Sequence, residues 1–135
     1  MVRWWRAKTC GWRERLTMGH VRVPIRLANP TDRSRQILVE SALDTGATWT
    51  TIPRAYANQL GLEIVGKQLA RAAGGPVSID QSYCYVEFEG RSMVAPVWVS
   101  DSYSGVFIGV ITLEALGFAV DPGTGKLTDS ELLLL

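Results

Sequence analysis

Turn residues divide this chain into short apolar runs, and their spacing constrains the fold more than any other feature of the sequence. After residue 20, Gly, Pro, Asn and Asp recur between runs that alternate in polarity or are rich in β-branched residues. Two short helices are indicated, one that follows Pro53 and stops at Gly61, and one over 112–116 that stops at Gly117. These patterns predict a mainly β fold with one or two short helices, in a closed, barrel-like sheet.

The individual strands are indicated by their polarity patterns. Residues 20–27 alternate between apolar and polar side chains, and residues 36–43 form a β-branched and apolar run. A long strand over 77–88 leaves a glycine-rich tip at Gly74 and Gly75, which predicts a hairpin. Further strands are predicted over 49–52, 93–99, 106–109, 118–120 and 126–128.

The length and composition of the chain are typical of one globular domain. Its 135 residues are enough for a single core and too few for two domains. Hydrophobic residues make up 47% and charged residues 20%, a balance that excludes a disordered chain, and the net charge of +1 indicates no particular partner.

The first 17 residues differ from the rest because basic and aromatic side chains alternate in them. The basic residues are Arg3, Arg6, Lys8, Arg13 and Arg15, and the aromatic ones are Trp4, Trp5 and Trp12. One interpretation is a leader, 1–17, that is disordered or lies outside the domain, with Met18 as the true start. The other is an arm that contacts nucleic acid, which we expect from no other part of the chain. The domain is then expected to span 18–130, before an apolar tail at 131–135.

The sequence gives no indication of export, membrane insertion or a bound metal. No apolar run is long enough for a secretory signal or for a membrane span. Cys10 and Cys84 are isolated, and His20 is the only histidine, so we expect a reducing, cytoplasmic setting, no metal and no cofactor.

Asp44 ends the predicted strand 36–43 and is followed by Thr45 and Gly46, which allow a tight turn. Asp-Thr-Gly by itself is a weak signal, since many turns contain it. Here Ala47 follows, residues 51–53 close the loop, and an apolar-apolar-Gly triplet, 107–109, recurs before the second predicted helix.

This order of motifs, over about 18–127, resembles the retropepsin-like aspartic proteases of clan AA, most closely their small bacterial and archaeal single-domain members. The resemblance implies a single-lobe acid-protease barrel in which a flap hairpin, about 69–79 with Gly74 and Gly75 at its tip, covers the substrate. It also implies an aspartic endopeptidase without a cofactor, in which Asp44, Thr45 and Gly46 form the catalytic motif.

Peptide hydrolysis by carboxylates requires two of them, one ionised and one protonated, within about 3 Å of each other. This chain contains one Asp-Thr-Gly, and Asp32, Asp80, Asp101 and Asp121 lie in unsuitable contexts. A twofold-symmetric homodimer would bring Asp44 beside its own copy. We therefore expect a homodimer that acts on a peptide or protein substrate. The resemblance implies that Thr45 then hydrogen-bonds across the axis.

The resemblance also suggests residues that contact the substrate. Ala47 adjoins the motif and has no hydroxyl that could donate to the carboxylate, and Gly74 and Gly75 belong to the flap. Ile52, Val77 and Ile108 are predicted either to line apolar subsites or to pack in the core. Trp49 and Trp98 are predicted to be core or dimer-contact aromatics. Thr48 and Val110 replace an acidic residue and an arginine of the retroviral pattern, so both members of that charged pair are absent.

Two alternative functions stay open at this point. The first is a non-catalytic module on the same fold that binds a peptide or protein segment, because a fold does not determine a function. The second uses the leader as a nucleic-acid-binding arm on that scaffold.

Overall fold

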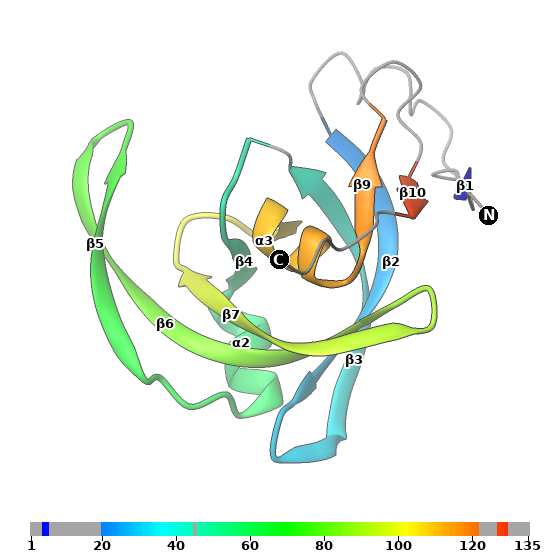
Figure 1. Cartoon of the computed structure of the whole chain (residues 1–135). Coiled ribbons are helices and arrows are strands. Elements are labelled where there is room, and N and C mark those ends of the chain that lie inside the picture. Colours follow the sequence, from blue (N-terminus) through cyan, green and yellow to red (C-terminus); the bar gives the residue numbers. More distant parts are fainter. Residues whose placement is uncertain (1–3, 6–19, 45, 122–126, 130–135) are drawn as a thin grey trace, which may run out of the picture.

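The computed structural model describes residues 4–5, 20–44, 46–121 and 127–129, and Figure 1 shows their arrangement. The elements are β1 Trp4–Trp5, β2 His20–Asn29, β3 Asp32–Asp44, β4 Thr50–Pro53, α2 Arg54–Leu60, β5 Gly66–Ala72, β6 Gly75–Phe88, β7 Arg91–Ser100, β8 Val106–Ile108, α3 Val110–Ala115, β9 Phe118–Val120 and β10 Leu127–Asp129. The prediction of a mainly β domain with two short helices is confirmed.

Six strands form a closed ring. Their order is β2-β3-β8-β4-β7-β6, and β6 returns to β2 through the pairs from Arg26↔Glu87 to Ala28↔Tyr85. Strand β5 is hydrogen-bonded only to β6, so the β5–β6 hairpin extends beyond the ring (Figure 1). The predicted barrel-like sheet is therefore confirmed, with a hairpin at the predicted flap position.

Strand alternation fills the inside of the ring with apolar side chains. On β2, Val23, Ile25 and Leu27 are at most 2% exposed, whereas Pro24 and Arg26, which alternate with them, are exposed. Burial of each such side chain stabilises the fold by about 1.5–3 kcal/mol. The main core residues contributed by the other strands are Leu43, Ile52, Val86, Val97, Val99 and Ile108.

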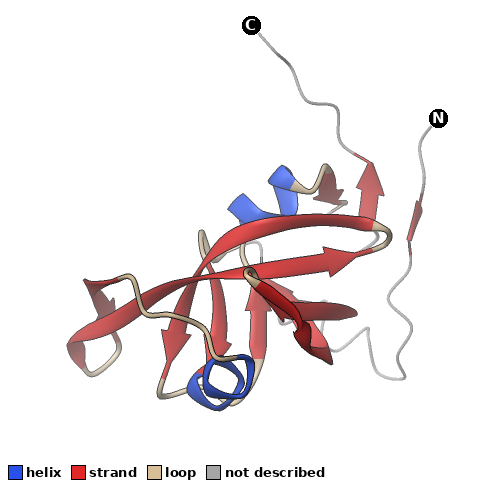
Figure 2. Cartoon of the chain, turned by 90° about the horizontal axis from the view of Figure 1, so that it is seen from below, coloured by secondary structure: helices blue, strands red, loops and turns tan. Residues whose placement is uncertain are grey.

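The two helices lie on different sides of the barrel (Figure 2). Helix α2 follows Pro53 and ends at Gly61, whose φ of 69° is the left-handed conformation expected of a glycine that terminates a helix. Helix α3 begins at Val110, two residues before its predicted start at 112. The reason is non-local, because the first N–H groups of a helix need outside acceptors and here a distant loop supplies them.

A second, small sheet joins part of the leader to the end of the domain. Trp4–Trp5 pairs with Leu127–Thr128 of β10, and β10 pairs with β9. The remaining leader residues, the tail 131–135 and most of the last predicted turn lie outside the described residues. Within the described part, no helix is long and apolar enough to cross a membrane.

Cys84 offers a test of how tightly the barrel is packed. Its side chain is fully buried on β6, and this burial raises the pKa of the thiol to about 12. In a Cys10→Ser background, we expect native protein at pH 8 to resist iodoacetamide over the time in which urea-unfolded protein is fully labelled, because the thiolate is the reactive form. Mass spectrometry measures the labelling, and equal rates in the two states would contradict this packing.

Candidate active site

Asp44 lies where three strands of the barrel meet. Strand β3 runs parallel to β8, with Leu43 opposite Ile108, and ends at Asp44. On the other side of β8, β4 pairs with it through Thr51↔Phe107. The loop between Asp44 and Thr50 therefore connects the two strands that flank β8. This arrangement places the start of the Asp-Thr-Gly motif beside the apolar-apolar-Gly triplet, 107–109.

The turn after Asp44 holds its carboxylate through a main-chain hydrogen bond. The Gly46 N–H donates to Asp44 Oδ1 at 3.0 Å, and the Ala47 N–H donates to the Asp44 carbonyl at 3.0 Å. A Cβ on Gly46 would lie 3.3 Å from Asp44 Oδ1 and would press on the carboxylate. Thr45, the third predicted catalytic residue, lies outside the described residues.

Backbone hydrogen bonds join this loop to the start of α3. The Val110 N–H donates to the Ala47 carbonyl at 2.8 Å, and the Ile111 N–H donates to the Thr48 carbonyl at 3.2 Å. Val110 and Thr48 are the positions where the charged pair of the retroviral pattern is missing. Main-chain bonds thus connect the same two segments without any charged side chain.

A buried hydroxyl pair completes the support of the loop. The Thr50 hydroxyl accepts the Gly109 N–H at 3.1 Å and donates to Thr112 Oγ1 at 2.7 Å. Both threonine side chains are at most 1% exposed. Since a buried polar group without a partner is costly, this pair fixes how closely β4 approaches the start of α3.

Matched substitutions of the two threonines test this support. Thr50→Val deprives both the Gly109 N–H and the Thr112 hydroxyl of a partner, so we expect a loss of about 2–3 kcal/mol in the free energy of unfolding. Thr112→Val removes a single bond and should cost about 1 kcal/mol. Urea unfolding of both variants measures the difference, and equal losses would show that the Gly109 bond contributes nothing.

An open pocket adjoins Asp44. Its volume is about 300 Å³, and it is lined by Asp44, Ala47, Thr51, Tyr103 and Phe107. The Tyr103 ring packs edge-on against Phe107, with centroids 5.8 Å apart and an interplanar angle of 73°. Ala47, a predicted substrate contact, is among the lining residues, whereas Thr51, Tyr103 and Phe107 were not identified from the sequence.

Ile52 and Ile108 do not line this pocket, and the structure decides between the two predicted roles in favour of the core. Ile52 is 0% and Ile108 3% exposed, within the main core cluster. Successive side chains of a strand point to opposite faces. Thr51 and Phe107, one residue before each isoleucine, therefore face the pocket.

The flap residues lie on the predicted hairpin. Ala72 pairs with Gly75, whose φ is 117°, so Ala73 and Gly74 form the tip. Val77 on β6 is 40% exposed and lies four residues before Gln81. Gln81 is paired with Trp98, and Trp98 is paired with the pocket residue Thr51, so these three side chains lie on one face of the sheet. Residues an even number apart on a strand share a face, so Val77 lies on the same side as the pocket.

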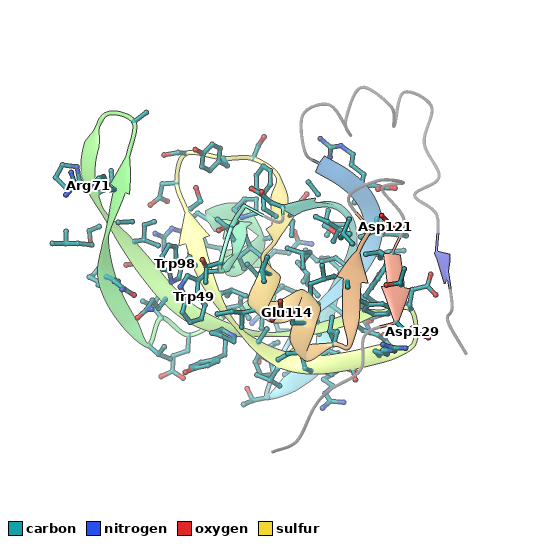
Figure 3. All side chains as sticks on the ribbon, turned by 45° about the horizontal axis from the view of Figure 1, so that its top comes forward. Trp49, Arg71, Trp98, Glu114, Asp121 and Asp129 are labelled. Carbon is teal, nitrogen blue, oxygen red and sulfur yellow. The ribbon has the colours of Figure 1, made fainter. Side chains whose placement is uncertain are left out.

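Trp49 and Trp98 lie on this same face and were assigned to a core or a dimer contact from the sequence. Both are half-buried, and their rings stack with centroids 5.9 Å apart and an interplanar angle of 24° (Figure 3). Trp98 Nε1 is buried without a hydrogen-bond acceptor in the described part of the chain. The tryptophan pair extends the apolar surface of the pocket toward the base of the flap.

Other carboxylates are engaged away from the pocket. Asp32 accepts hydrogen bonds from Ser34, while Asp80 and Asp101 bind basic side chains, and these contacts lower the pKa of each of the three carboxyls. Among the described residues, Asp44 is the one carboxylate that lines the pocket, and no three His, Cys, Asp or Glu side chains gather as a metal site.

Solved structures identify this architecture. The crystal structure of a retropepsin-like aspartic protease from Rickettsia conorii matches with a TM-score of 0.60 and 16% identity, covering 96% of this chain and 91% of that one. EIAV protease complexed with the inhibitor HBY-793 matches with a TM-score of 0.56 and 19% identity, over 85% of this chain and 93% of that one. The solution structure of Simian Foamy Virus (mac) protease matches with a TM-score of 0.51 and 20% identity, over 70% of this chain and 94% of that one.

No family profile and no curated protein sequence matches this chain. The structural matches define its class: it has the retropepsin-like fold of aspartic proteases. Within that class, its single lobe is shared with viral proteases and with a bacterial protein.

Proposed function

We propose that this protein is an aspartic endopeptidase that cleaves peptide bonds in extended polypeptides and is active as a homodimer. The observation that carries the proposal is the placement of Asp44. Its carboxylate accepts the Gly46 N–H at the edge of an open pocket. The loop that carries it is held by main-chain hydrogen bonds from Val110 and Ile111 at the start of α3. Such bracing is a requirement for a group that must meet a reacting atom within a fraction of an ångström.

The chemistry of the reaction explains the need for a second subunit. One carboxylate removes a proton from water while the water oxygen attacks the peptide carbonyl carbon, and a protonated carboxyl donates its proton to the carbonyl oxygen. The carboxyl that removed the proton from water then gives it to the leaving nitrogen as the carbon–nitrogen bond breaks. A hydroxyl of the hydrated carbon returns its proton to the other carboxylate, so the dyad recovers its starting state. Because one chain places one carboxylate at the pocket, twofold symmetry is the simplest source of the second, and Thr45 would then bond across the axis.

The pocket beside Asp44 suggests the kind of residue that the enzyme prefers. Two aromatic rings, Tyr103 and Phe107, and the short side chains of Ala47 and Thr51 form its walls. An apolar or aromatic side chain next to the scissile bond fits these walls. The flap, with Gly74, Gly75 and Val77, would bind the extended substrate from the other side partly through backbone hydrogen bonds.

Cleavage of a peptide library tests this function, with a pepstatin-like transition-state analogue as the inhibitor. We expect inhibitor-sensitive cleavage next to large apolar residues, and a dimer in sedimentation velocity under the same conditions. Binding without cleavage would instead support a peptide-binding module, and cleavage by a strict monomer would refute the shared dyad.

A further inference from the structure

The start of α2 carries a side chain that joins three segments of the molecule. Arg54 Nε and Nη2 donate to the two carboxylate oxygens of Asp101 at 2.9 and 3.0 Å, and Arg54 Nη1 lies 2.8 Å from Asp80 Oδ2. The second oxygen of Asp80 accepts a bond from Lys67 Nζ at 2.6 Å. The two-point contact with Asp101 is the strong, directional form of an arginine–carboxylate pair.

Asp80 marks the position at which the flap leaves the barrel. Strand β6 pairs with β7 from Asp80↔Val99 to Phe88↔Arg91, and residues nearer the tip pair with β5 alone. The Asp80 side chain is only 13% exposed, and Lys67 lies directly opposite it on β5. Arg54 therefore binds the hairpin at Asp80, the point where it leaves the barrel, which is called the flap hinge below.

Asp101 marks the start of the loop that forms one wall of the pocket. The preceding Ser100 side chain accepts the N–H groups of Ser102 and Tyr103, both at 3.1 Å, so the first turn of this loop is fixed. Tyr103 is 63% exposed, and its ring contacts Phe107 at the pocket. Through Asp101, Arg54 is therefore attached to the turn that carries Tyr103.

We propose that Arg54 is a positioning residue that links the flap hinge to the Tyr103 loop, so that one guanidinium aligns the two surfaces between which a substrate binds. This inference rests on the proposed function for its consequence on substrates. Arg54 lines no part of the pocket, and its two arms are separable, because Asp80 serves the hairpin and Asp101 serves the loop. A lysine could not replace it, since an ammonium lacks the planar fork.

Hydrogen–deuterium exchange of the full chain tests the linkage without reference to activity. In Arg54→Met we expect faster exchange in both 67–79 and 101–105. Asp101→Asn should affect mainly the loop, and Asp80→Asn mainly the hairpin. Arg26→Met is the matched control, because Arg26 also makes two side-chain contacts, to Glu87 and Gln36, on a surface remote from the pocket. Unchanged exchange in both segments of Arg54→Met would overturn the inference.

Steady-state kinetics then measures the consequence for substrates. We expect Arg54→Met to raise KM about three- to tenfold for peptides with a large apolar residue beside the scissile bond, with kcat changed less than about twofold, as for the loss of a partly exposed ion pair that acts through position. Arg26→Met should leave both constants unchanged. A uniform fall in kcat with an unchanged KM would also refute a positioning role. If the wild type cleaves no peptide, the proposed function fails alone, and the exchange data still decide the role of Arg54.

Discussion

Asp44→Asn is expected to lower cleavage by at least about 10³-fold, because general acid–base catalysis contributes on that scale and asparagine can neither take nor give the proton. The side chain has almost the same size, and its oxygen can still accept the Gly46 N–H that now reaches Asp44 Oδ1 at 3.0 Å. The loop and the fold should therefore persist. Initial rates on a cleaved library peptide measure the effect.

The control for this substitution is physical integrity. The unfolding midpoint and the sedimentation coefficient of Asp44→Asn should match those of the wild type, so that the loss belongs to chemistry alone. Residual activity within tenfold of the wild type would show that Asp44 is not the reacting group. A variant that separates into monomers would instead assign Asp44 a role in assembly.

Gly109→Ala is expected to destabilise the fold by about 3–5 kcal/mol, near the upper end for one added methyl group. A Cβ at Gly109 would lie 2.4 Å from the Trp49 carbonyl carbon, 2.6 Å from the Trp49 oxygen and 2.7 Å from the Thr48 oxygen. These are main-chain atoms of the loop that supports Asp44, so no side chain can rotate away to make room. Against a total stability of about 5–15 kcal/mol, such a loss leaves little folded protein. Urea unfolding followed by tryptophan fluorescence measures it.

Gly105→Ala is the matched control for that substitution. Gly105 lies just before β8 and Gly109 just after it, and a Cβ on Gly105 would meet Phe107 at 3.9 Å, an ordinary contact. The expected change is within about 0.5 kcal/mol, as for most surface substitutions. Similar losses for the two variants would mean that the close approach of the loop to Gly109 has no energetic weight.

Much of the fold follows from local signals in the sequence. The stop of α2 at Gly61 is a local signal, and the structure places it as predicted. The glycine-rich tip of the flap is also local, and the observed tip, Ala73 and Gly74, lies one residue before the predicted one. The closed ring was harder to predict, since its closing pairs, such as Arg26↔Glu87, join distant parts of the chain. Such pairs leave no local mark beyond strand-like composition.

The walls of the pocket show what the sequence alone did not decide. Ile52 and Ile108 lie on the faces of their strands that point into the barrel, so they belong to the core and not to the pocket. The strand period of two would have indicated Thr51 and Phe107, provided that the inward face had been fixed first. Tyr103 gave no signal, because it lies on a turn between strands and reaches the pocket only through its contact with Phe107.

The support of Asp44 also has a consequence for the order of events during synthesis. Thr50 bonds to Gly109 and Thr112, 59 and 62 residues further along the chain, and β3 has no parallel neighbour until β8 has been made. At about 5–20 residues per second, the ribosome needs several seconds to supply that segment, long after Asp44 has emerged. A nascent or truncated chain therefore carries the aspartate without the groups that hold it in place. The site proposed here is therefore assembled only when nearly the whole barrel exists.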